Sequence, residues 1–163
     1  MISIQLAGAD DFDRIWPLLR DVFRAGDTYA VDPDISRDAA FTYWMRQAKA
    51  TYVAVDAGRV VGTYYIKTNQ AGGGAHICNC GYIVSADARG QGIAAQLCIH
   101  SQNAAAALGY SAMQFNFVLS SNESAVRLWQ TLGFATVGTI PDAFAHPQFG
   151  MVDAFVMHKK LPD

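Results

Sequence analysis

YIVSADARGQGIA, residues 82–94, joins an expected apolar strand to the start of a long helix. Gly90 and Gly92 lie at the junction, where residues without a Cβ leave successive backbone N–H groups uncovered. These amides add to the positive end of the helix dipole, and such an arrangement suits a phosphate or diphosphate group. No Gly-Lys-Ser/Thr follows, and the dinucleotide pattern Gly-x-Gly-x-x-Gly is absent. The stretch by itself therefore favours either an anion site or an ordinary structural turn.

A second motif, NESAVRLWQTLGF, spans residues 122–134. Asn122 is a favourable N-cap, and Gly133 stands where a left-handed residue commonly ends a helix. The apolar residues between them recur at helical spacing, which predicts an amphipathic helix packed on a sheet. They are Ala125, Leu128, Trp129 and Leu132.

In this order, the two segments resemble the GCN5-related N-acetyltransferase (GNAT) superfamily. The family pattern Arg/Gln-x-x-Gly-x-Gly/Ala is met by Arg89, Gly92 and Ala94. The later pattern Asn-x-x-Ala-x-x-Leu-Tyr-x-x-Leu-Gly-Phe is met at Asn122, Ala125, Leu128, Leu132, Gly133 and Phe134. Trp129 stands where the family usually has tyrosine, so a proton donor typical of the family is missing at this position.

Composition and charge are those of a globular enzyme, with one domain expected over residues 1–163. A net charge of −2 without a basic run argues against nucleic acid as a partner. No apolar run approaches the roughly 20 residues of a membrane span, so no membrane partner is expected. The N-terminus does not resemble a secretory signal, and 3 cysteines are an odd number, so we expect reduced thiols and a cytoplasmic location. The sequence leaves a homodimer open.

Apolar periodicity and breakers predict the element order β-α-α-β-β-β-α-β-α-β-β. Pro17 is expected to kink or shorten the first helix, and a loop containing Pro141 and Pro147 is expected between the last two strands. We expect strands at 2–7, 51–56, 59–68, 76–84, 111–119, 134–140 and 151–159. We expect helices at 10–23, from Ser36 onward, at 90–108 and after Asn122. The fold class is α/β (α+β), and the resemblance implies a central mixed, mostly antiparallel, twisted sheet with helices on both faces and splayed middle strands.

The resemblance also implies how acetyl-CoA, the expected co-substrate, would bind. Its pantetheine arm would lie between the splayed strands, where backbone groups around Ile83 and Val84 would pair with its amides. Asn122 would meet the arm near its thiol end, a role compatible with capping the helix. The diphosphate would be held chiefly by main-chain N–H groups of Arg89, Gly90, Gln91, Gly92, Ile93 and Ala94. No metal is expected.

Further local matches resemble the fungal L-azetidine-2-carboxylate N-acetyltransferases, which acetylate small cyclic imino acids related to proline. The matches are GTYYIK at 62–67, His76, Cys78-Asn79, Gly81, Phe115-Asn116 and Trp129. In that subgroup, the asparagines that match Asn79 and Asn116 line the substrate site. The resemblance therefore implies a small-molecule amine as acceptor.

The two asparagines cannot titrate, so their amides can only donate and accept hydrogen bonds. We assign Asn116 to a substrate carboxylate and Asn79 to orienting the amine or an activating water; satisfying local backbone is the alternative for each. Trp129 can donate its N–H to the departing thiolate or form an apolar wall, but it cannot replace tyrosine as a proton donor. Tyr82 is expected at the substrate and is a candidate proton donor. Phe41, Tyr43 and Trp44 on the second helix are expected over the pocket, with core packing as the alternative.

His76, Cys78 and Cys80 alternate along one strand and therefore share one side of it. Their spacing lacks the Cys-x-x-Cys pattern and the fourth ligand of a zinc site, so buried packing is the favoured interpretation. A second interpretation places His76 at the cleft as the proton acceptor for the amine. His146 is a candidate for the border of the site.

The favoured function is an acetyl-CoA-dependent N-acetyltransferase, in which a small amine attacks the thioester directly. A proline-like cyclic imino acid such as azetidine-2-carboxylate is the expected acceptor. One alternative keeps this chemistry with a peptide or protein amine. Another, motivated by the missing tyrosine, is a non-catalytic module that binds acyl-CoA.

Overall fold

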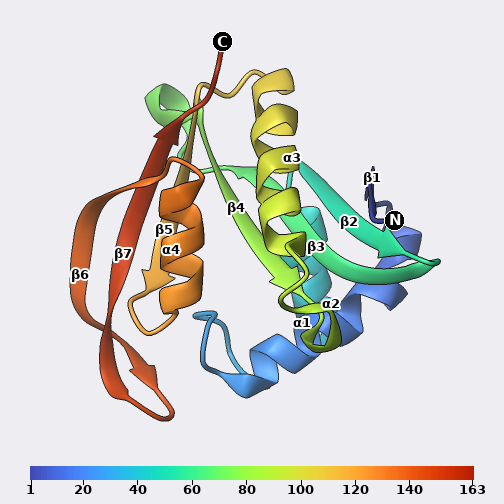
Figure 1. Cartoon of the computed structure of the whole chain (residues 1–163), viewed down its shortest axis with the longest axis horizontal. Coiled ribbons are helices and arrows are strands. Elements are labelled where there is room, and N and C mark those ends of the chain that lie inside the picture. Colours follow the sequence, from blue (N-terminus) through green and yellow to red (C-terminus); the bar gives the residue numbers. More distant parts are fainter.

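One twisted sheet organises the chain, and the computed structural model describes every residue from 1 to 163 (Figure 1). The 7 strands lie in the order β1-β2-β3-β4-β5-β7-β6. They are β1 (Ser3–Leu6), β2 (Ala50–Asp56), β3 (Arg59–Thr68), β4 (Ile77–Val84), β5 (Ala112–Leu119), β6 (Ala135–His146) and β7 (Gly150–Lys160). The α-helices are α1 (Phe12–Ala25), α2 (Arg37–Phe41), α3 (Ile93–Ala107) and α4 (Glu123–Thr131). None of these helices combines the length and apolar character that crossing a bilayer requires.

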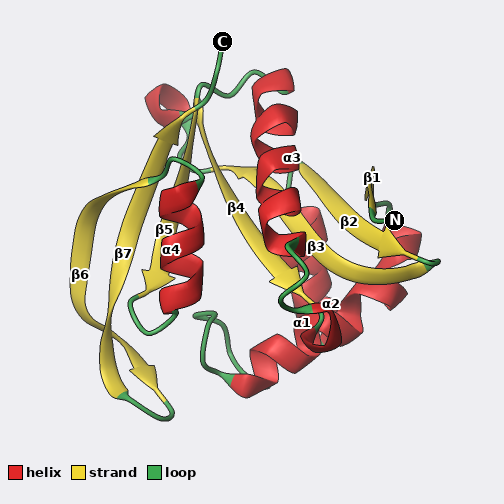
Figure 2. Ribbon diagram, in the orientation of Figure 1, coloured by secondary structure: helices red, strands yellow, loops and turns green.

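Helices cover both faces of the sheet (Figure 2). Alternation along β3 divides the core, because successive side chains of a strand point to opposite faces. Tyr64 packs in the cluster that also contains buried residues of α3 and α4. Tyr65 packs in the second cluster, with buried residues of α1, α2 and η2 (Thr42–Arg46). The predicted fold class is therefore confirmed.

Strands β4 and β5 are parallel and separate soon after they meet. Only two residue pairs join them, Ile77 with Ala112 and Cys78 with Met113. Beyond these pairs, β4 stays on β3 as far as Val84, while β5 continues along β7. The remaining neighbours are antiparallel. The predicted splay of the middle strands is therefore present.

Two prolines that were expected to interrupt their elements do not end them. Helix α1 continues through Pro17 to Ala25, and Pro17 is exposed, so water can reach the carbonyl left without a partner. Strand β6 also runs through Pro141, because β6 is an edge strand, where a missing N–H costs no ladder bond. The register of β6 shifts between Ile140 and Phe144, so the proline marks an irregular stretch of strand rather than a loop.

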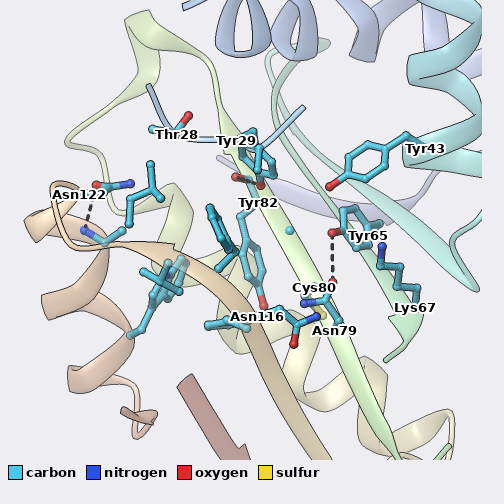
Figure 3. A pocket seen from close by; sticks show the side chains of 18 residues that line it. Thr28, Tyr29, Tyr43, Tyr65, Lys67, Asn79, Cys80, Tyr82, Asn116 and Asn122 are labelled. Carbon is cyan, nitrogen blue, oxygen red and sulfur yellow. Dashed lines mark hydrogen bonds between the residues drawn. The ribbon is translucent and has the colours of Figure 1, made fainter. Parts of the chain in front are cut away.

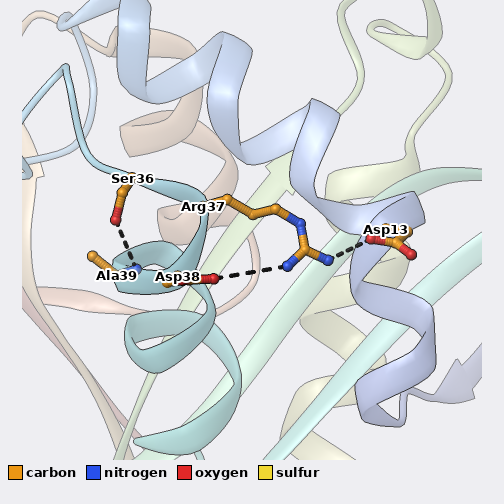
Figure 4. Close-up of polar contacts among 5 residues, drawn as sticks. All are labelled: Asp13, Ser36, Arg37, Asp38 and Ala39. Atoms are coloured by element: carbon orange, nitrogen blue, oxygen red, sulfur yellow. Dashed lines mark hydrogen bonds and ion pairs between the residues drawn. The ribbon is translucent and has the colours of Figure 1, made fainter.

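The second helix is short and changes its pitch. Ser36 caps α2 by accepting a hydrogen bond from the Ala39 amide at 3.1 Å, and Arg37 reaches Asp13 on α1 (Figure 4). After Phe41, the chain continues as the π-helical turn η2. This turn places a fully buried Trp44 against the sheet.

A small polar network fixes Trp44 in that position. Its indole N–H donates to Thr63 Oγ1 at 3.1 Å, and Thr63 donates in turn to the Tyr52 carbonyl at 2.9 Å. Thr51 donates to the Trp44 carbonyl at 2.8 Å. Buried polar groups stabilise a fold only when they are paired, and these hydrogen bonds pair the buried groups that hold η2 to β2 and β3.

Replacing Thr63 by valine keeps the shape of the side chain but leaves the Trp44 N–H buried without an acceptor. We expect Thr63→Val to lower the free energy of unfolding by about 1–3 kcal/mol, as measured by urea denaturation. Thr139→Val, on the exposed edge strand, serves as the control and should change stability by less than about 0.5 kcal/mol. Equal stability of the two variants would contradict the role given to this network.

Candidate active site

A cavity of about 260 Å³ opens where β4 and β5 part (Figure 3). Its walls come from the α1–α2 connection, η2, β3, β4, β5 and α4. The lining side chains are mainly aromatic or amide, and they include Tyr29, Tyr43, Tyr65, Lys67, Asn79, Tyr82, Phe115, Asn116, Asn122 and Trp129. The splay therefore produces a site that runs between the two middle strands.

The cavity has two chemically different ends. Asn122 lies on one side of Tyr82, toward α4, whereas Tyr43, Tyr65 and Lys67 lie on the other side (Figure 3). The first end adjoins the helix that carries the second sequence motif. The second end is covered by the aromatic residues of η2 and β3. One ligand can thus enter from each side and meet another near Tyr82.

The turn before α3 presents a run of unpaired backbone amides. Gly90 and Gly92 adopt φ angles of 77° and 74°, which only glycine adopts readily. From residue 89 to residue 95 no amide donates to a protein group, and Gln96 is the first amide of the helix with an acceptor, the Gly92 carbonyl. Helix α3 consequently begins at Ile93, later than the predicted residue 90. This geometry fits the diphosphate of acetyl-CoA.

The charges around this turn also favour an anion. Arg89 is exposed and forms no ion pair. Asp87 is the acidic residue within the turn, and the Arg59 guanidinium, assisted by the Ser85 hydroxyl, holds its pKa below the usual range. Because Asp87 is paired with Arg59, its charge is partly compensated where the diphosphate would bind.

Along the edge of β4 that faces the splay, every second residue has backbone groups that do not pair with β3. The Ser85 amide donates to the Val61 carbonyl at 2.9 Å, so in this register Ile83 is directed at β3 and Val84 at the splay. The Tyr82 carbonyl also faces the splay, where it accepts a hydrogen bond from the Tyr29 hydroxyl at 3.0 Å. Of the two residues predicted to pair with pantetheine, only Val84 has backbone groups available; the prediction for Ile83 is wrong because β3 already uses them.

Asn122 and Trp129 lie at the end of the cavity next to α4. Asn122 Oδ1 accepts from the Ala125 amide at 3.4 Å, while its Nδ2 donates to no protein group. The Trp129 ring packs on Tyr82 and Phe115, with centroid distances of 5.1 Å to each, and its N–H also has no protein acceptor. Both residues therefore keep a free donor beside the cavity.

Tyr82 cannot act as the proton donor in this arrangement. Its hydroxyl points under α3, where it shares a hydrogen bond of 2.6 Å with Ser101 Oγ. Burial raises the pKa of the Tyr82 hydroxyl well above its usual value. The ring lines the cavity, but the acidic atom lies behind it, so the prediction of Tyr82 as a stand-in acid is wrong.

The predicted asparagines meet at the other end of the site. Asn79 Oδ1 accepts from the Tyr65 hydroxyl at 3.2 Å, and its Nδ2 donates to the Gln114 carbonyl at 2.9 Å. Asn79 thus bridges β4 and β5 just where their pairing stops. Asn116 lies at the rim and donates to Asn69 Oδ1 at 2.7 Å. Each amide keeps hydrogen-bonding capacity for a ligand.

Three further predictions for site residues differ from the structure. Phe41 lies outside this cavity, because η2 turns it onto Phe12, with ring centroids 5.0 Å apart. His76 is exposed in the turn before β4, whereas Cys78 and Cys80 are buried, so His76 neither packs with them nor borders the cavity. His146 instead accepts from two amides of its own hairpin turn. No cluster of His, Cys, Asp or Glu has an arrangement that could hold a metal ion.

Tyr43 lines the cavity, as expected for an aromatic residue of the second helix, whereas Trp44 packs in the core. Sequence reasoning did not assign Tyr29, Tyr65 or Lys67 to the cavity, although all three line it. Tyr65 and Lys67 could have been found, because antiparallel pairing of β3 with β4 places Lys67 opposite Asn79. Tyr29 lies in an irregular connection, and no periodicity in the sequence indicates its position.

Comparison with known proteins identifies the fold. The sequence pattern of the acetyltransferase (GNAT) family matches residues 12–134, more than half of the chain. The chain belongs to this family. A GCN5-related N-acetyltransferase from Kribbella flavida has 41% sequence identity and a TM-score of 0.93, over 98% of each chain. N-acetyltransferase aca1 of Schizosaccharomyces pombe is 29% identical over 84% of this chain and 74% of its own length.

These findings confirm the predicted activity in its general form. The protein is an acetyl-CoA-dependent N-acetyltransferase of the GNAT family, and the match to a fungal N-acetyltransferase is consistent with the fungal subgroup. A structure of yncA from Salmonella typhimurium with acetyl-CoA has the same fold, with a TM-score of 0.85 at 19% identity over 100% of this chain and 95% of that one. The enzyme is thus more than a non-catalytic acyl-CoA-binding module.

A methyl group added at Gly90 meets no protein atom within 4 Å, but alanine disfavours the φ of 77° that this turn requires. We expect Gly90→Ala to weaken acetyl-CoA binding by about tenfold or more, because ionic hydrogen bonds are each worth about 1.5–3 kcal/mol. Calorimetric titration with CoA measures the effect. Gly109→Ala is the matched control, since Gly109 also has a positive φ and open space but lies at the far end of α3. Equal loss of affinity in both variants would contradict the assigned diphosphate site.

Proposed function

We propose that the enzyme acetylates the nitrogen of a small cyclic imino acid, with azetidine-2-carboxylate as the reference acceptor. The observation that carries this proposal is the size and chemistry of the acceptor end of the cavity. It is walled by Tyr29, Tyr43 and Tyr65, with the buried amide of Asn79 between the strands and the exposed amide of Asn116 at the rim. The local resemblance to enzymes that use such acceptors, including Trp129, supports the same assignment.

A peptide or protein amine is the second candidate and fits the cavity less well. A lysine side chain brings a positive charge and usually requires acidic residues to receive it. No Asp or Glu lines this cavity, and the one charged lining residue is the cation Lys67. A lysine acceptor would therefore meet repulsion rather than attraction.

Transfer requires a neutral nitrogen, a positioned thioester and a stable leaving group. The acceptor nitrogen attacks the acetyl carbon, the new C–N bond forms, and the C–S bond breaks with its electron pair passing to sulfur. The nitrogen then loses its proton to water. The Trp129 N–H is free to donate to the sulfur; because a thiol pKa is about 8.5, the thiolate can leave without a strong acid.

Asn79 is well placed to orient the acceptor. Its amide is fixed between Tyr65 and the β5 backbone, so one N–H and one lone pair point in defined directions. The neighbouring hydroxyls do not supply a base, since burial raises the pKa of Tyr29, Tyr43 and Tyr65. We infer that the acceptor loses its amine proton to solvent before it attacks.

An acceptor panel tests the proposal, with release of the CoA thiol as the measurement. It should contain azetidine-2-carboxylate, hydroxyprolines, free amino acids and lysine-containing peptides. We expect kcat/KM for the cyclic imino acids to exceed that for the peptides by about 100-fold, because a lysine-containing peptide would meet the Lys67 cation in a cavity without acidic residues. Higher kcat/KM for the peptides, or no release with any imino acid, would contradict the proposed acceptor class.

The pH dependence follows from the raised pKa of the lining tyrosines. Because these groups stay protonated between about pH 6 and about pH 9, no protein base limits the reaction in that range, and kcat/KM should rise as the acceptor nitrogen loses its proton. The apparent pKa should therefore shift between acceptors in step with their own amine pKa. Initial rates at subsaturating acceptor measure it. An apparent pKa that stays constant across acceptors would instead reveal a protein base.

A further inference from the structure

Lys67 is an unpaired cation inside an otherwise uncharged cavity. Of the 18 residues that line the cavity, no other is ionised near neutral pH. The Lys67 side chain is half-buried, takes part in no ion pair, and has its pKa lowered by that burial. Withdrawing an ammonium group from water is unfavourable unless an anion or dipoles replace the lost solvation.

Aromatic rings hold the ammonium group at the acceptor end. Lys67 Nζ lies 5.4 Å from the ring centroid of Tyr43 and 5.2 Å from that of Tyr65. These contacts orient the cation, and an exposed cation–π contact is worth only about 0.5–1 kcal/mol. The rings therefore position Lys67 and leave its N–H donors without strong acceptors.

The neighbours of Lys67 complete one polar corner of the cavity. Asn79 on β4 is the partner of Lys67 in the strand register. Asn69, which lies two residues after Lys67, accepts a hydrogen bond from Asn116. In Figure 3, Lys67, Asn79 and Asn116 lie on the same side of Tyr82. A charged donor and two amides at one corner offer hydrogen bonds suited to a carboxylate.

Three other basic residues of the enzyme differ from Lys67, because each is paired with groups of the protein. Arg37 and Arg59 form ion pairs with Asp13 and Asp87. Lys159, which is also partly buried, donates to Gln102 Oε1 and to the Leu132 carbonyl at 2.6 Å and 2.7 Å. Lys67 lies in the cavity with cation–π contacts but with no ion pair or hydrogen bond to the protein. The missing partner is therefore best supplied by the ligand.

We propose that Lys67 is a specificity-determining residue that binds the carboxylate of the acceptor. This inference rests on the proposed function and narrows it, because the enzyme then selects amino and imino acids over the same amines without an acid group. The carboxylate lies against Lys67, with Asn116 beside it. The acceptor nitrogen is then directed inward, toward Tyr82 and Trp129, where the thioester arrives from the Asn122 side.

Lys67→Met tests the inference, because methionine keeps much of the apolar stem and removes the charge. The acceptors are azetidine-2-carboxylate and its uncharged carboxamide, which share the same ring nitrogen. We expect the wild-type enzyme to prefer the carboxylate in kcat/KM by about 10- to 100-fold, the range of an ionic hydrogen bond. The variant should lose this preference through a higher KM for the carboxylate, with kcat changed by less than about threefold.

Lys49→Met is the matched control. Lys49 Nζ also lies over a tyrosine ring, 5.4 Å from the centroid of Tyr110, but Lys49 is exposed and outside the cavity. This variant should keep the wild-type preference for the carboxylate. A carboxylate preference that survives in Lys67→Met would overturn the role of Lys67 while leaving the acetyltransferase function intact.

Direct binding separates failure of this inference from failure of the proposed function. Calorimetric titration of azetidine-2-carboxylate into the CoA-saturated enzyme requires no turnover. Binding that is weakened by about tenfold or more in Lys67→Met supports the carboxylate site even if the acceptor is not acetylated, an outcome that would contradict only the proposed reaction. Absence of carboxylate binding in the wild-type enzyme, or equal binding in both proteins, would overturn the assignment.

Discussion

The separation of β4 from β5 is the constraint on which the site depends. Two residue pairs join the strands, and then Asn79 spans the widening gap to the Gln114 carbonyl. Aromatic packing keeps the gap from closing, because Phe115 stacks on Phe134 at 4.3 Å and Tyr82 packs against Trp129. A parallel pair that continued would have used the β4 backbone groups that now face the cavity. The binding site is therefore lined by β4 backbone groups that the sheet leaves without hydrogen-bond partners.

The two ends of this gap favour anions through different groups. At the turn before α3, free backbone amides and a helix N-terminus suit an anion, and the charge of Asp87 is compensated by Arg59. At the acceptor end, a single half-buried ammonium group, Lys67, stands among rings and amides. Both ends favour anions, and the space between them is neutral. This distribution suits a reaction in which only the attacking nitrogen must lose its charge.

Tryptophan at position 129 is consistent with the same chemistry. The indole fills the space between Tyr82 and Phe115 and contributes an N–H, but no proton that it can release near neutral pH. The buried tyrosines have raised pKa values, so they shape the cavity and orient its ligand without titrating. Catalysis in such a site relies on placing the amine against the thioester, an effect that can be large when the geometry is fixed. The aromatic walls and the network around Trp44 provide that rigidity.

The sequence by itself determined the family, the sheet with helices on both faces, and the glycine turn, because these depend on local motifs and apolar periodicity. Asn79, Asn116, Asn122 and Trp129 all line the cavity. The first two were expected from the resemblance to the fungal subgroup, and the last two belong to the second motif. Only the tertiary structure decided that Phe41 packs on Phe12 and that the Tyr82 hydroxyl points under α3. The place of Tyr29 in the cavity wall likewise emerged only from the fold, because the connection between α1 and α2 is remote in sequence from the other lining residues and has no periodic pattern.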